Sequence, residues 1–143
     1  MKALLFLWQF PQHLFALLVW GALRTAGRVV RTERDGAPPG NVFITVRARG
    51  WGVSLGRYIF LDAGYGGETR KHERGHSWQS RIFGPLYLLV IGIASAVFNN
   101  LWDRVFHTGW AADRRTAWYY GRFPEAWADR LGGVRRGGHD GSD

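Results

Sequence analysis

The apolar residues of this chain gather in two runs, residues 3–23 and residues 82–98. The first run contains no Asp, Glu, Lys or Arg over its 21 residues, which is long enough for a helix to span a bilayer. We therefore expect residues 3–23 to form a membrane anchor rather than a cleaved signal peptide. By the positive-inside rule, the basic residues that follow place this end in the cytoplasm. These residues are Arg24, Arg28, Arg31 and Arg34.

The remaining composition narrows the class of protein. The 143 residues fit one domain, expected at 25–134 between the anchor at 1–24 and a disordered Gly-rich tail at 135–143. No cysteine is present, which excludes disulfides, thiolate metal sites and a cysteine nucleophile. The net charge is +8, but the arginines are scattered. We therefore expect the basic protein to bind membrane lipid rather than nucleic acid.

The segments between and after the apolar runs predict an α+β domain. Residues 42–48 and 53–61 are rich in β-branched and aromatic side chains and predict a short antiparallel hairpin. A helix is expected over residues 69–83, and the Gly84-Pro85 pair separates it from a following apolar helix. Residues 124–131, PEAWADRL, predict a short last helix.

The helix expected over residues 69–83 carries the motif His72-Glu73-Arg74-Gly75-His76. Residues four apart lie on one face of a helix, so both imidazoles can reach one tetrahedral metal ion. Glu73 lies about 100° further round the helix, beside such an ion, where a general base takes a proton from metal-bound water. The pattern indicates a Zn²⁺ site with His72 and His76 as ligands and Glu73 as the catalytic base.

A catalytic zinc ion usually has a third protein ligand. Glu125 is the first choice, because it lies in the last predicted helix and shares a face with Asp129, four residues further on. Glu125 would bind the metal, while Asp129 would accept a hydrogen bond from a ligand histidine. The alternative third ligands are His107, Asp103 and Asp113.

These residues resemble two groups of proteins. The HExxH motif with a downstream ExxxD is similar to the glutamate-ligand zincins of the thermolysin-like clan, which implies the ligands His72, His76 and Glu125 with Asp129 behind a histidine. Most of the chain more closely resembles a family of small, uncharacterised bacterial membrane-associated HExxH proteins, and this implies a metallopeptidase. The resembling segments are LWQFPQHL (7–14), WGVSLGRYIFL (51–61), KHERGHSWQSRIFGPLYLLVIGIAS (71–95) and PEAWADRLGGV (124–134). The 49 positions from His76 to Glu125 depart from the thermolysin-like pattern.

The second apolar run places a condition on a shared site. If residues 82–98 crossed a membrane, Glu125 would lie on the opposite side from the motif histidines, and no later segment is apolar enough to return. The run has 17 residues, at the lower limit for a span, so we expect a buried or re-entrant helix that folds back. If the run did span, His13 would become a candidate metal ligand. Otherwise we expect His13 to be a polar residue packed within a helix bundle.

The sequence therefore predicts a membrane-associated zinc metallopeptidase with a minimal zincin-like domain. A strand within residues 53–61 would hold the peptide or protein substrate by backbone pairing. Tyr119, Tyr120, His107 or an arginine would stabilise the oxyanion. The alternative is a non-catalytic membrane-anchored protein in which the zinc is structural. The sequence carries no signal for an oligomeric state.

Overall fold

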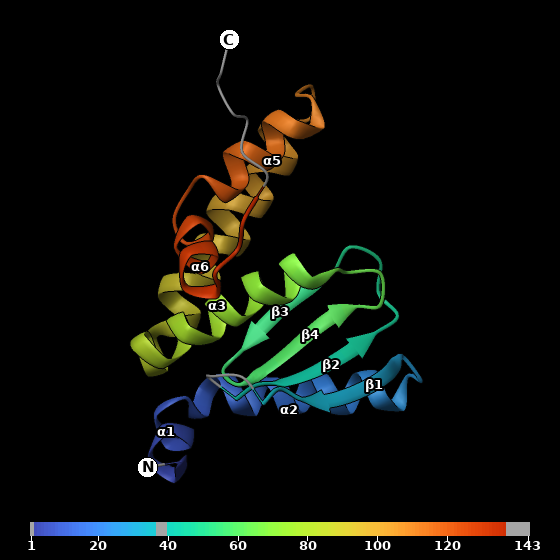
Figure 1. The fold of residues 1–143 in the computed structure, drawn as a ribbon, viewed down its shortest axis with the longest axis vertical. Helices are drawn as coiled ribbons and strands as arrows, with labels where there is room; N and C mark the ends of the chain where they lie inside the picture. Colours follow the sequence, from blue (N-terminus) through green and yellow to red (C-terminus); the bar gives the residue numbers. More distant parts are fainter. Residues whose placement is uncertain (1, 37–39, 137–143) are drawn as a thin grey trace.

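A computed structural model describes residues 2–36 and 40–136 of the chain, and its centre is a four-stranded mixed sheet (Figure 1). The strands are β1 (Val29–Arg34), β2 (Val42–Val46), β3 (Gly52–Leu55) and β4 (Tyr58–Asp62). Their order across the sheet is β1-β2-β4-β3. β2 and β4 are parallel, and the other two pairs are antiparallel. Together with the helices, this sheet confirms the expected α+β class.

The strand pairing differs from the expected hairpin of residues 42–48 with residues 53–61. The antiparallel hairpin is formed within residues 52–62, by β3 and β4, and β2 lies parallel to β4. The reason is Gly56, whose φ of +66° lets the chain reverse in a two-residue turn. β1, which the sequence did not predict as a strand, pairs with the other side of β2.

Helices cover both faces of the sheet. They are α2 (Phe10–Thr25), which follows α1 (Lys2–Trp8), on one side and α3 (Gly67–Phe83) on the other. Successive residues of a strand point to opposite faces. Ile44 and Phe60 accordingly pack around Ala16 of α2, whereas Phe43 and Ile59 belong to a second cluster on the α3 side. The sheet is thus a layer between α2 and the motif helix.

The first apolar run is not one continuous helix. Residues 3–23 form α1 and α2, which meet at Gln9. The polar residues that interrupt the run, Gln9, Gln12 and His13, are buried and attach the run to the rest of the protein. Gln9 Nε2 donates to Ser80 Oγ (2.8 Å), and His13 Nε2 accepts a hydrogen bond from the β3–β4 turn. The interruptions therefore mark the side of the run that packs on the domain.

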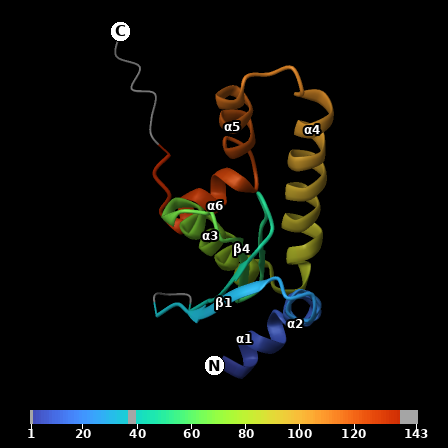
Figure 2. The ribbon, with the colours of Figure 1, turned by 90° about the vertical axis from the view of Figure 1, so that its right-hand side faces the viewer.

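A long helix, residues 84–106, follows α3. It consists of a 3-10 turn, η1 (Gly84–Leu86), two π-helical stretches, η2 (Leu88–Gly92) and η3 (Ala94–Leu101), and α4 (Trp102–Phe106). It runs away from the sheet, α5 (Ala112–Tyr120) returns beside it, and α6 (Glu125–Gly132) then packs on α3 (Figure 2). Within the described residues, Leu88–Phe106 is the one helix with the length and composition to cross a membrane, a test that a soluble core helix also passes.

Candidate metal centre

The site forms where α6 crosses α3, and two glycines set the closeness of this crossing. A Cβ atom on Gly75 would overlap the backbone carbonyl of Ala128, and a Cβ atom on Gly132 would overlap the carbonyl of Lys71. Any larger residue at either position would hold the two helices apart. The close contact brings Glu125, at the start of α6, to the histidine side of α3. The apolar run is no barrier between them, because the chain returns along α5.

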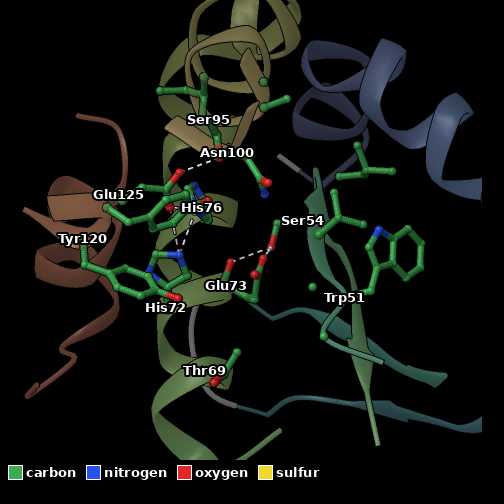
Figure 3. Close-up of a pocket in the computed structure, with 18 of the residues that line it drawn as sticks. Trp51, Ser54, Thr69, His72, Glu73, His76, Ser95, Asn100, Tyr120 and Glu125 are labelled. Carbon is green, nitrogen blue, oxygen red and sulfur yellow. Dashed lines mark hydrogen bonds and ion pairs between the residues drawn. The ribbon is translucent and has the colours of Figure 1, made fainter. Parts of the chain in front are cut away.

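Three ligand atoms converge at this crossing. Nε2 of His72, Nε2 of His76 and Oε2 of Glu125 lie 3.1 Å apart in every pair. All three side chains are buried, and Figure 3 shows them pointing into one space. Atoms about 2.0–2.1 Å from a tetrahedral zinc ion lie roughly 3.3–3.4 Å apart, so this triangle closely matches one face of the tetrahedron. Within residues 2–36 and 40–136, this is the group of side chains that could hold a metal ion.

Each ligand side chain is oriented by a partner on its other side. His72 Nδ1 lies 2.6 Å from Asp129 Oδ1, and His76 Nδ1 lies 2.8 Å from Gln79 Oε1. With Nδ1 donating in both rings, both Nε2 atoms are directed at the metal position. The tautomers are thus those that a metal ligand requires. The expected role of Asp129 agrees with this geometry.

The carboxylates of the site are held in the same manner. Ser95 Oγ, from the long helix, donates to Glu125 Oε1 at 2.5 Å and leaves Oε2 for the metal position. Arg136 donates to both oxygens of Asp129, at 2.5 and 2.9 Å, and its guanidinium lies over the ring of Tyr120. A chain of contacts therefore runs from Arg136 through Asp129 to His72.

The charge of the cluster favours a cation. Burial opposes ionisation of Glu125, but the contacts with His72, His76 and Ser95 outweigh it and lower the pKa of this carboxyl far below its usual range. Burial also opposes the charged form of His72, but hydrogen bonds to Asp129 and Glu125 raise the pKa of the imidazole to about 9. Without a metal, a proton on His72 thus balances the buried carboxylates. A divalent cation can take the place of that proton.

Glu73 lies in the wall of the adjoining cavity. This cavity has a volume of about 470 Å³, and the three ligand side chains also line it. Ser54 Oγ lies 2.7 Å from Glu73 Oε2 and 2.8 Å from the backbone oxygen of Glu73, which holds the carboxylate toward β3. A Cβ atom on Gly52 would lie only 2.9 Å from Glu73 Oε1, so glycine makes room for this oxygen. The expected base and ligands therefore share one cavity.

The edge strand β3 forms another part of the cavity wall. The Asp62 N–H donates to the Trp51 carbonyl at 2.9 Å, so Gly52 and Leu61 are a pair without mutual hydrogen bonds. The backbone groups of Gly52 and Ser54 consequently point away from β4. Tyr87 Oη donates to the Ser54 carbonyl at 3.0 Å, and this carbonyl is therefore engaged. β3 therefore lines the same cavity as the three ligand side chains.

Two tyrosines of α5 line the same cavity. The ring of Tyr120 packs edge-on against His72, with the ring centroids 5.2 Å apart. Burial raises the pKa of Tyr119 and of Tyr120, so both hydroxyls stay protonated at neutral pH and can donate hydrogen bonds. Of the oxyanion donors that the sequence offered, these two tyrosines and Arg104 line the cavity, and His107 does not.

The alternative third ligands lie elsewhere. Asp103 accepts hydrogen bonds from Arg115, with Oδ2 at 2.6 Å from the guanidinium, and lies 3.2 Å from His107 Nδ1. Asp113 is exposed in the first turn of α5. His13, the candidate for a spanning second run, is buried in α2 against the β3–β4 turn. None of these four belongs to the cluster of His72, His76 and Glu125.

Several residues of the site were not predicted from the sequence. Gln79 continues the helical stripe of His72 and His76, and that periodicity was a usable signal. Ser95 is a polar residue inside an apolar run, which is a weaker signal. Ser54 carries no signal, because its contact with Glu73 depends on how β3 packs on α3. Arg136 falls in the segment expected to be a tail, most of which, residues 137–143, lies outside the described residues.

Comparisons of the chain with protein-family models, with curated proteins and with solved structures gave no match. The case for a metal site therefore depends on the geometry and charge of its own residues.

Proposed function

We propose that the protein is a zinc-dependent peptidase. The observation that carries the proposal is the buried triangle of His72, His76 and Glu125, which adjoins a cavity that Glu73 also lines. Two imidazole nitrogens and one carboxylate oxygen in a tetrahedral arrangement are a ligand set suited to Zn²⁺. With three protein ligands, one coordination position is left for water, as in catalytic rather than structural sites.

The residues around the triangle have the chemistry that hydrolysis requires. A zinc ion held by His72, His76 and Glu125 would activate a water and polarise the carbonyl of a bound substrate. Glu73 accepts the proton of that water and donates it to the leaving amine. Tyr119 or Tyr120 donates a hydrogen bond to the developing oxyanion. Ser54 holds the Glu73 carboxylate in the wall of the cavity, which supports this role for Glu73.

The edge strand supports a peptide as the substrate. The outward N–H and carbonyl of Gly52 and the outward N–H of Ser54 can pair with an extended chain laid along β3. Such pairing depends on the backbone alone, so it holds peptides of different sequence beside the ligands. The zincin-like identity rests on this combination of an edge strand, an HExxH helix and a distant glutamate.

The test is peptide hydrolysis by the zinc-loaded full-length protein, with Glu73→Gln as the variant and Glu68→Gln as its control. Glu68 is an exposed acid on the same helix, paired with Lys71. Both variants are expected to retain zinc, because neither residue is a ligand. Hydrolysis of a quenched fluorescent peptide library should fall about 10²- to 10⁴-fold for Glu73→Gln only.

Full hydrolysis by Glu73→Gln would contradict the peptidase proposal. Zinc retention without hydrolysis by the wild type would favour the alternative, a membrane-anchored protein with structural zinc.

A further inference from the structure

Two helices of this protein bury polar residues among apolar ones on their inner sides and expose large apolar residues on their outer sides. In α2 the side facing the domain contains Gln12 and His13, and in the long helix it contains Ser95 and Asn99. The opposite sides are apolar and exposed. A soluble helix places its apolar side inward, so these outward sides match a solvent other than water.

The exposed apolar residues of the two helices form one surface, which we call the apolar face. Figure 2 shows α2 at the foot of the long helix, both on the side of the molecule away from α3 and α6. The two helices touch where η1 contacts α2. Leu18 and Leu89 on this face are 63% and 62% exposed, and Phe106 is 61% exposed. The face is defined here by Leu14, Phe15, Leu18, Leu89, Phe98 and Phe106.

The charge distribution favours an anionic lipid surface as the partner. The chain has a net charge of +8. Arg24 is exposed at the end of α2, and Arg104 is exposed near the far end of the long helix, where it also borders the cavity of the metal centre. Arginines at the margin of an apolar face attract anionic headgroups while the apolar side chains enter the hydrocarbon. A second copy of this chain would bring like charges together.

The contacts of the long helix indicate how it lies relative to a membrane. A hydrocarbon slab about 30 Å thick around Leu88–Phe106 would also enclose whatever packs on its inner side. That inner side carries Glu125, which Ser95 contacts, and the Asp103–Arg115 ion pair. Burying these charges in hydrocarbon is strongly unfavourable. A helix lying along the membrane surface keeps them on the aqueous side.

We propose that the apolar face rests in one leaflet of an anionic bilayer, with α2 and the long helix parallel to the membrane plane. This differs from a spanning anchor at residues 3–23, because α2 packs against the sheet on its inner side. The proposal does not depend on peptidase activity.

The first experiment measures binding of the full-length protein to vesicles of phosphatidylglycerol and phosphatidylcholine by sedimentation. The wild type should sediment with these vesicles and much less with pure phosphatidylcholine. Leu18→Glu and Phe98→Glu should each weaken binding at least about tenfold, because each puts a charge where hydrocarbon is expected. The matched control is Val30→Glu. Val30 is an apolar residue of β1 that is 51% exposed, against 63% for Leu18 and 59% for Phe98, and it is not part of the apolar face, so this change should leave binding as in the wild type.

The second experiment measures how deeply residues of the long helix enter the bilayer. The chain has no cysteine, so single cysteines at Leu89, Phe98 and Phe106 can each carry a fluorophore. Quenching by lipids with nitroxides at known depths should place all three labels at the same shallow depth. A deep label at Phe98 between shallow ones would show that the helix spans and would overturn the proposed orientation. Failure to bind vesicles would overturn the lipid partner, as would a dimer that the glutamate variants dissociate.

Discussion

Two histidine–carboxylate clusters of this protein use the same residue types in different ways. In the first, the metal cluster, Glu125 Oε2 faces two imidazole nitrogens at 3.1 Å. In the second, the Asp103 cluster, the carboxylate is engaged by the guanidinium of Arg115 and by His107. The ring of His107 is stacked on Trp110 at 3.8 Å between centroids, with Trp118 at its edge.

The difference lies in which group balances the carboxylate. Arg115 supplies a permanent positive charge to Asp103, so that cluster has no need of a metal ion. At Glu125 the balancing charge is a proton on His72, which a divalent cation can replace. A histidine beside a carboxylate therefore indicates a metal site only when several ligand atoms converge and the carboxylate is not paired with an arginine.

Removing a ligand should produce the largest contrast between the clusters. We expect Glu125→Ala to lower zinc affinity by more than about 100-fold, because even outer partners of metal ligands are worth 10- to 100-fold. Asp103→Ala should keep wild-type affinity. Zinc content and competition with a chelating dye would measure both. Equal zinc affinity in the two variants would contradict the assignment of Glu125.

Separating α3 from α6 should disturb the metal cluster without touching a ligand. Gly75→Ala places a methyl group on the Ala128 carbonyl, and we expect it to lower the free energy of unfolding by about 3 kcal/mol, with weaker zinc binding. The control is Gly109→Ala, beside the Asp103 cluster, where a Cβ atom meets nothing within 4 Å. Denaturant unfolding would measure both variants. A silent Gly75→Ala would show that the crossing is not close.

Asp129→Asn tests the orienting bond to His72. The amide is uncharged and holds the imidazole less firmly, so zinc affinity should fall about 10- to 100-fold while the ligands stay in place. Zinc titration by calorimetry would measure this change. An unchanged zinc affinity would mean that Asp129 pairs with Arg136 but does not orient His72 for metal binding.

The smallest effect is expected from Asp103→Asn. Its ion pair with Arg115 is partly exposed to solvent, so its loss should lower the melting temperature by no more than about 4 °C. Zinc binding should remain at the wild-type level. A marked loss of zinc would mean that the two clusters are coupled through α5, which carries both Arg115 and Tyr119.

The sequence predicted the local parts of this site better than the distant ones. α3 and α6 begin and end within about two residues of their expected bounds, because helical periodicity and glycine stops are local signals. The ExxxD spacing also identified the acid that reaches the histidines. The parallel pairing of β2 with β4 could not be predicted from the sequence, because it depends on a turn at Gly56 and on contacts between residues that are far apart in the sequence. α5 was missed because its sequence mixes charged and aromatic residues without a clear stripe.

The glycine contact between α3 and α6 changes what counts as the signature of the site. In the usual form of the motif, the two positions between Glu73 and His76 are left open. Here the second of them must be glycine, because the Ala128 carbonyl occupies the place of its side chain. Gly132 is fixed in the same way from the other helix. Chains that build this site should therefore share the paired pattern H-E-x-G-H and E-x-x-x-D-x-x-G, in which both glycines are required by the helix contact.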